Sequence, residues 1–281
     1  MWGMNTTERV AVVGVPVDEN SSFMRGPAAA PRHIREALRS DSTNLCAENG
    51  VDLKTDPRWW DAGDVGSAEE QPSFTQIEEH LDGLLGQGTA VIALGGDHSI
   101  TYPLVRAHAR IHTGLNLLHL DAHPDLYDEL DGSRISHACP FARILEEELV
   151  ARLVSIGIRT ANPHQRQQAE RFGVETYGVT DDWSAALASL RPPLYLSLDL
   201  DVLDPAFAPG VSHYEPGGLS TRDVLEILHD LPCPPIGADI VELNPDRDLH
   251  GVTAMVAAKV LKEIIARMLV SPSSSTLPVW S

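Results

Sequence analysis

The chain has 281 residues, the length of one large domain, and 43% of them are hydrophobic, which suffices for a sizeable core. Its formal net charge of −19 argues against polyanionic partners, so we expect binding to neither nucleic acid nor membrane surfaces. No apolar run is long enough to span a membrane, and residues 1–10 are too polar for a secretory signal. The cysteines, Cys46, Cys139 and Cys233, are few and form no short motif, so we expect a reduced, cytoplasmic protein.

Apolar runs that predict β-strands alternate with amphipathic stretches along the chain. In chain order, the predicted strands are residues 9–15, 58–62, 90–94, 115–121, 152–157, 174–177, 194–200 and 236–243. The clearest predicted helices lie between or after these strands, at residues 31–39, 74–85, 221–229 and 252–269. Ser220 is the expected N-cap of the third of these helices.

Several predicted strands are continuous apolar runs, which is typical of strands buried on both faces of a parallel sheet. Together with the β–α alternation, this predicts an α/β fold of three layers, α/β/α, with a mainly parallel eight-stranded sheet. We expect a single domain at residues 1–270. The serine-rich residues 271–281 are expected to form a flexible tail.

Acidic residues and histidines follow three of the predicted strands. They are His98 after the third strand, Asp121, His123 and Asp125 after the fourth, and Asp199 and Asp201 after the seventh. Ligands of open α/β sheets bind beyond the carboxyl ends of the strands. Alternate side chains of an extended segment point the same way, so we expect these residues to converge from one side.

A lone aspartate at a strand end commonly bonds to a turn, and a lone histidine is commonly a hydrogen-bonded core residue. A cluster of acids is different, because packed carboxylates repel one another and stay ionised most easily when they bind cations. The six residues above exceed the needs of one tetrahedral zinc ion. Ligands rich in oxygen, with some imidazole, suit a pair of manganese ions. The sequence therefore predicts a binuclear metal site.

Three motifs in order resemble the ureohydrolase family, which contains arginases, agmatinases and formiminoglutamases. They are Gly-Gly-Asp-His-Ser at 95–99, Asp-Ala-His-Pro-Asp at 121–125 and Ser-Leu-Asp-Leu-Asp-Val-Leu-Asp-Pro at 197–205. The likeness extends over residues 14–262, and several further stretches look like plant-type arginases. It implies an arginase-like fold and a homo-oligomer, either a trimer or a hexamer.

The resemblance also implies how two Mn²⁺ ions would be held. The first ion would be bound by His98, Asp121, Asp125 and Asp199. The second would be bound by Asp121, His123, Asp199 and Asp201, so that Asp121 and Asp199 bridge the pair. Asp204 falls in a turn of the third motif and is interpreted as structural.

Catalytic roles fall on His137, Glu242 and Asp125 by the same resemblance. Glu242 would hold the planar guanidinium through paired, charge-assisted hydrogen bonds. Water acidified by two cations would attack the guanidinium carbon, and His137 would pass a proton to the departing amine. The expected products are urea and an amine. A formiminoglutamase would use the same mechanism and release formamide.

The substrate stays open between arginine and agmatine, with guanidinobutyrate as a third candidate. Animal-type arginases carry an asparagine where this chain has Tyr127, and an acid where it has Asn162. Arg134 could bind a substrate carboxylate, although a solvated loop arginine is the simpler interpretation. Cys139 is interpreted as a packing residue beside the loop of His137.

Two other classes of protein are less consistent with the sequence. A zinc deacetylase on a related fold would hold one metal with fewer carboxylates. A metal-binding protein without activity would not need the full set of ligands together with His137 and Glu242.

Overall fold

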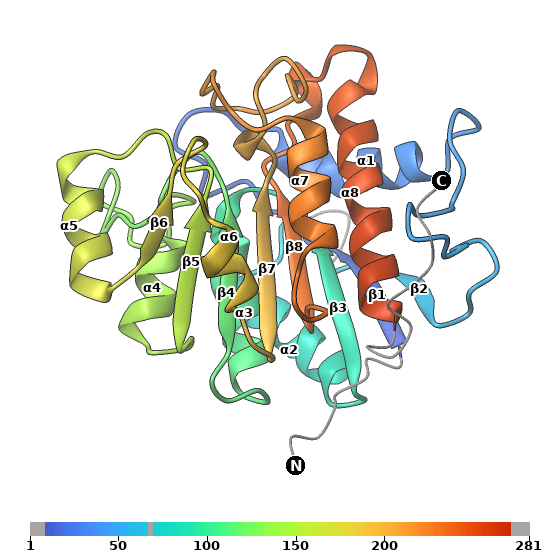
Figure 1. Cartoon of the computed structure of the whole chain (residues 1–281), viewed down its shortest axis with the longest axis horizontal. Coiled ribbons are helices and arrows are strands. Elements are labelled where there is room, and N and C mark those ends of the chain that lie inside the picture. The colour runs from blue at the N-terminus through green and yellow to red at the C-terminus, as the bar shows by residue number, and fades with distance from the viewer. Residues whose placement is uncertain (1–8, 67–69, 271–281) are drawn as a thin grey trace.

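The computed structural model describes residues 9–66 and 70–270, and its centre is one eight-stranded sheet (Figure 1). In chain order the strands are β1 (Arg9–Gly14), β2 (Trp59–Asp64), β3 (Thr89–Leu94), β4 (Asn116–Leu120), β5 (Arg152–Ile156), β6 (Glu175–Tyr177), β7 (Leu194–Asp199) and β8 (Gly237–Val241). Their order across the sheet is β2-β1-β3-β8-β7-β4-β5-β6. Every strand pairing among the described residues is parallel, so the predicted α/β fold is confirmed.

Helices cover both faces of the sheet. They are α1 (Ala30–Leu38), α2 (Phe74–Leu85), α3 (Thr101–Ala109), α4 (Pro140–Glu146), α5 (Pro163–Phe172), α6 (Ser184–Ala188), α7 (Thr221–His229) and α8 (Val252–Leu269). Residues of α1, α6, α7 and α8 share one apolar core with the sheet, and residues of α2, α3 and α4 share the other. This division gives the three predicted layers (Figure 1). The helices predicted at 74–85, 221–229 and 252–269 have the expected ends.

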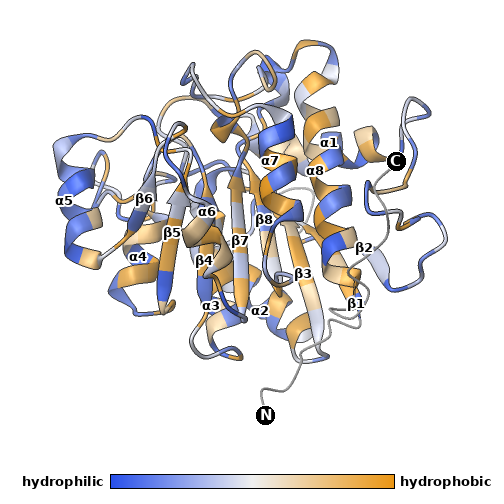
Figure 2. Ribbon diagram, viewed as in Figure 1, coloured by the Kyte–Doolittle hydropathy of each residue, from blue (hydrophilic) through white to orange (hydrophobic). Residues whose placement is uncertain are grey.

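The strands are buried on both faces because their side chains alternate between two apolar cores. In β1, Val10 and Val12 belong to one core, while Ala11 and Val13 belong to the other. Figure 2 shows the contrast between the largely hydrophobic β3 and the largely hydrophilic helix α5. Ser220 caps α7 as predicted, because its side chain accepts the backbone N–H of Asp223.

The strand order brings four chain segments together at one edge of the sheet. The chain leaves β3 and forms β4 at a distance, and β8 and β7 later fill the space between them. The carboxyl ends of β3, β8, β7 and β4 therefore lie side by side, at the upper edge of the sheet in Figure 1. A change of direction in strand order is where parallel α/β sheets bind ligands.

Residues 271–281, which the sequence predicts to be a flexible tail, lie outside the described residues. Across residues 9–66 and 70–270, no helix has both the length and the apolar character needed to cross a membrane.

Candidate metal centre and active site

Two glycines place His98 at the carboxyl end of β3. A Cβ atom on Gly96 would lie 1.7 Å from the carbonyl oxygen of Val17, so a larger residue does not fit. Asp97 then accepts the backbone N–H of Ser99 at 3.0 Å and starts the turn that leads into α3. The side chain of His98 is fully buried as a result.

Three carboxylates surround one nitrogen of His98. Its Nδ1 lies 3.1 Å from Oδ2 of Asp121, 3.1 Å from Oδ2 of Asp125 and 3.2 Å from Oδ2 of Asp199. Each of these acids is buried. One imidazole nitrogen and three carboxylate oxygens thus lie close together, which suits a cation with mixed nitrogen and oxygen ligands.

The hydrogen bond made by Nε2 of His98 indicates that Nδ1 has a lone pair available for a metal. Nε2 lies 3.0 Å from Oγ of Ser197, and Ser197 donates to Oδ1 of Asp239 at 2.7 Å. Because the serine hydrogen is directed to Asp239, the serine oxygen accepts from the Nε2–H of His98. In a neutral imidazole, Nδ1 then keeps its lone pair, as a metal ligand requires.

The electrostatics of this cluster also indicate a cation. Burial, together with repulsion from Asp201 and Asp121, raises the pKa of Asp199 well above its usual range. Burial opposes a charged imidazole at His98, but the surrounding acids outweigh it and raise the pKa of His98 well above its usual value. Concentrated negative charge contributes to both shifts, in addition to burial at Asp199, and a bound metal ion would relieve it.

A second candidate position lies beside the first. Nδ1 of His123 lies 3.1 Å from Oδ2 of Asp201 and 3.4 Å from Oδ1 of Asp121. Ligand atoms of these residues all lie within 4.8 Å of one another. Asp121 thus faces His98 with one oxygen and His123 with the other. The His123 side chain is 25% exposed, whereas that of His98 is 0% exposed, so this second position is the more open one.

Turns, and not extended segments, bring these side chains together, so the physical reason given from the sequence is wrong. Asp125 has a left-handed backbone with a φ of 47°, and Asp201 lies in a 3-10 turn that follows β7 directly. Non-glycine residues adopt positive φ rarely and at some energetic cost, and such positions are concentrated at functional sites. The predicted residues converge because the chain bends immediately beyond each strand.

His137 and Glu242 form a hydrogen-bonded pair next to this cluster. Nδ1 of His137 lies 2.9 Å from Oε1 of Glu242, and its Nε2 lies 2.9 Å from Oγ of Ser22. The backbone N–H of His98 donates to the same Glu242 oxygen at 2.9 Å. Glu242 also has a positive φ, 67°, which turns its side chain at the end of β8.

In this pair His137 is positively charged and Glu242 is negatively charged. Burial lowers the pKa of His137, but the Glu242 carboxylate more than offsets this and raises it to about 9. Burial works against ionised Glu242 in the same way, and the adjacent His137 keeps its pKa below the usual value. The protonated imidazole of His137 can give up a proton, and the ionised carboxylate of Glu242 can pair with a cation.

A cavity of about 220 Å³ opens onto this centre. Its lining residues are Ser22, His123, Asp125, Tyr127, Leu130, His137, Ala138, Thr160, Asn162, Gln165, Asp199, Asp201, His213 and Glu242. The described residues that line it include acids, histidines and neutral polar groups but no lysine or arginine. Tyr127 and Asn162 bond to each other within the lining, with Nδ2 of Asn162 donating to the tyrosine oxygen at 2.8 Å.

Other residues discussed from the sequence lie outside the cavity lining. Arg134 pairs with Asp128 at 2.7 Å and Glu146 at 2.8 Å. Asp204 accepts backbone N–H groups of its own turn, among them that of Ala206 at 2.8 Å. Cys139 is buried, and burial raises the pKa of its thiol to about 11.

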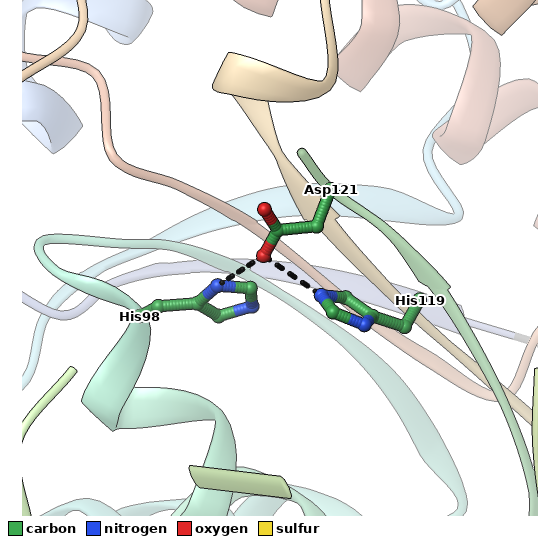
Figure 3. Close-up of side chains that lie close together, drawn as sticks. All are labelled: His98, His119 and Asp121. Carbon is green, nitrogen blue, oxygen red and sulfur yellow. Dashed lines mark hydrogen bonds and ion pairs between the residues drawn. The ribbon is translucent and has the colours of Figure 1, made fainter. Parts of the chain in front are cut away.

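Four residues of this region were missed by sequence reasoning: His119, Ser197, His213 and Asp239. His119 bonds to Asp121 from below, and His213 lines the cavity with its ring stacked 5.2 Å from that of His137 (Figure 3 draws His98, His119 and Asp121). A signal existed for His119, because it precedes Asp121 by two residues on the same strand face. The partners of Ser197 and Asp239 depend on strand register, which the sequence does not display.

Comparison with known proteins identifies the family of the chain. The model of the Arginase family matches residues 8–266. Arginase 1, mitochondrial, of Arabidopsis thaliana is 46% identical over 92% of this chain and 80% of its own length. The human guanidino acid hydrolase, mitochondrial, is 34% identical over 92% of this chain and 78% of its own length.

The solved structure of arginase from Medicago truncatula superimposes with a TM-score of 0.87 at 41% identity, covering 93% of this chain and 88% of the other. The range matched by the family model, residues 8–266, includes all eight strands of the sheet. The chain belongs to the Arginase family and is a ureohydrolase of the arginase and agmatinase type, a hydrolase of carbon–nitrogen bonds in guanidino compounds.

Proposed function

We propose that this protein is a binuclear manganese hydrolase that converts arginine to urea and the corresponding amine. The observation that carries the proposal is the arrangement at His98, whose Nδ1 lies 3.1–3.2 Å from three carboxylate oxygens while its Nε2 is bonded to Ser197. Carboxylate oxygens with some imidazole are ligands that suit manganese.

The ligand sets proposed here follow the contacts of the two histidines. One Mn²⁺ would be held by His98, Asp121, Asp125 and Asp199, and the other by Asp121, His123, Asp199 and Asp201. When bound, two such ions acidify a water molecule and stabilise the negative charge that develops during its attack.

The side chains of the cavity perform the remaining steps. Ionised Glu242 pairs with the guanidinium and orients its plane, since charge-assisted hydrogen bonds to a planar cation are directional. His137 carries a proton at neutral pH and donates it to the nitrogen that leaves as the amine. Ser22, bonded to Nε2 of His137, keeps the imidazole facing the cavity. Asp125 both contributes to the first metal position and borders the cavity.

Arginine is favoured as the substrate because a plant arginase is 46% identical to this chain. Agmatine is the second candidate, because a substrate carboxylate would meet no lysine or arginine in the described lining, and the protonated His137 is already paired with Glu242. The name of the human relative points to guanidino acids as a third class. Formiminoglutamate would use the same metal centre and release formamide.

The test is urea release from arginine, agmatine and guanidinobutyrate in parallel after loading with Mn²⁺, with Asp199→Asn as the blank. We expect urea from arginine at the highest kcat/KM and none in the blank. Formamide from formiminoglutamate, with no urea from the three guanidino compounds, would replace the proposed substrate. Urea release that is unchanged in Asp199→Asn would overturn the proposed metal mechanism.

Assembly and location complete the proposal. We propose a homo-oligomer, a trimer or hexamer, which light scattering coupled to size-exclusion chromatography would measure. A cytoplasmic location remains our prediction, although the Arabidopsis relative is named mitochondrial. Fractionation of the source cells would test it.

A further inference from the structure

His119 is a fully buried histidine beneath the candidate metal centre, outside the proposed ligand sets. Its Nε2 lies 2.8 Å from Oδ2 of Asp121, and its Nδ1 lies 3.1 Å from Oγ of Ser155. Ser155 is the register partner of His119 on the neighbouring strand β5. Figure 3 shows His98 and His119 approaching the same Asp121 oxygen from two sides.

The two histidines differ in what surrounds them. Nδ1 of His98 faces three acids, whereas among the described residues Asp121 is the one acid paired with His119. The second nitrogen of His119 is engaged by Ser155, whose hydroxyl can give its hydrogen to Nδ1. Nε2 then carries a hydrogen, in the neutral ring as well as in the charged one. His98, His119 and Asp121 lie close enough to share one ion, but with this tautomer Nε2 of His119 has no lone pair for a metal and instead donates to Asp121.

Packing keeps the His119 ring in place. Its centroid lies 3.9 Å from that of Phe141, with an interplanar angle of 36°. Phe141 is fully buried on α4 and also meets His98 edge-on, at 5.3 Å and 89°. The donor is therefore held at a fixed position relative to both Asp121 and His98.

We propose that His119 is a positioning residue that donates a hydrogen bond to Oδ2 of Asp121 and thereby orients this carboxylate, which would help to hold the two metal ions. The inference rests on the binuclear site proposed above. Oδ1 of Asp121 already accepts the backbone N–H of His123 at 2.6 Å. With a donor on each oxygen, rotation of the carboxylate is restricted before metal binds, so less entropy is lost on binding.

Two substitutions of similar polarity separate the donated hydrogen bond from the rest of the side chain. The amide nitrogen of His119→Gln reaches as far from the backbone as Nε2, so it can still donate to Asp121. The amide of His119→Asn reaches only as far as Nδ1 and cannot. His108→Asn is the matched control, because His108 is also buried but bonds to the backbone oxygen of Leu104.

The experiment titrates MnCl₂ alone into the metal-free full chain and follows free Mn²⁺ by electron paramagnetic resonance. We expect His119→Asn to bind at least one Mn²⁺ about 10–100-fold more weakly than wild type, the range typical for lost partners of metal ligands. His119→Gln and His108→Asn should stay within about threefold of wild type, since both keep the donor to Asp121.

Wild-type Mn²⁺ affinity in His119→Asn would overturn the proposal. An equal loss in the Gln and Asn variants would also overturn it, because the ring and not the donated hydrogen would then matter. If the Asn variant does not fold, Ser155→Ala takes its place. We expect this variant to bind Mn²⁺ more weakly than wild type, and unchanged Mn²⁺ affinity would contradict the proposal. If the wild-type chain binds no Mn²⁺, the proposed function itself is contradicted. If the wild-type chain binds Mn²⁺ and the variants bind it with the same affinity, only the role of His119 is contradicted.

Discussion

Helix α3 has a buried histidine near each end, and the two have opposite surroundings. His98, just before the helix, faces three carboxylates at the carboxyl edge of the sheet. His108, in the last turn, packs against the start of β8, where a Cβ on Gly237 would lie 2.3 Å from its Nε2. Burial lowers the pKa of His108 to about 4, whereas the acids raise that of His98 despite its burial.

The contrast shows what distinguishes a cation site from a packed histidine. Burial alone favours the neutral imidazole, and one hydrogen bond to the Leu104 carbonyl is enough to orient His108. Several converging acids favour the charged imidazole or a bound cation instead, because positive charge relieves the repulsion among the carboxylates. The position of a histidine in the core therefore says less about function than the charges facing it.

Among the substitutions at the candidate metal centre, Asp121→Asn should have the largest effect, because Asp121 faces both proposed histidine ligands, His98 and His123. The substitution removes one negative charge and replaces one of the two carboxylate oxygens with an amide nitrogen. We expect both Mn²⁺ ions to be lost after dialysis and urea release to fall by at least about 10⁴-fold. Elemental analysis and a urea assay measure these quantities. Two retained metals with normal turnover would show that Asp121 does not bridge, and His108→Asn serves as the unaffected control.

His137→Gln should separate proton transfer from metal binding. We expect kcat to fall about 10²–10⁴-fold, as for loss of a general acid, with unchanged metal content. Since His137 has a pKa raised to about 9 and acts as an acid, wild-type kcat should decrease as pH rises through that value. The variant should lack this decrease. A pH profile of the same shape in both proteins would exclude His137 as the donor.

The candidate metal ligands were predictable from the sequence because each lies at or shortly after the end of an apolar run. Strand ends in a parallel sheet share one edge, so proximity followed from the fold class. The local geometry was not predictable. The positive φ of Asp125 and the turn at Asp201 depend on contacts beyond the strands, and a pattern of alternate residues does not reveal them.

The polar groups beneath the centre were missed for a different reason. His119 pairs with Ser155 across β4 and β5, and Ser197 with Asp239 across β7 and β8. These pairs depend on strand order and register, which bring together residues 36 and 42 positions apart. A single sequence shows such residues only as isolated polar positions within apolar strands.

At the opposite end of α3, His108→Asn should change the pH dependence of stability. The pKa of His108 is about 4 in the folded protein and about 6.5 when unfolded. Below pH 6.5 the unfolded chain therefore takes up the proton first, and folding stability decreases until about pH 4, by about 3 kcal/mol in all. The variant should lack this part of the decrease. Urea unfolding of metal-free protein between pH 4 and pH 7 measures it, and parallel stability curves would contradict the assignment.

Asn162→Asp should have the smallest effect and tests the substrate end of the cavity. Asn162 caps α5 by accepting the backbone N–H of Gln165 at 2.9 Å, and aspartate caps equally well, so the fold should be kept. The new carboxylate can pair with the amino group of arginine or agmatine, which guanidinobutyrate lacks. We expect kcat/KM for both amines to rise about fivefold relative to guanidinobutyrate, the effect of one partly screened ion pair. An equal change for all three substrates would mean that Asn162 only caps the helix, and substrate choice would then depend on other groups in the lining, such as Tyr127 or His213.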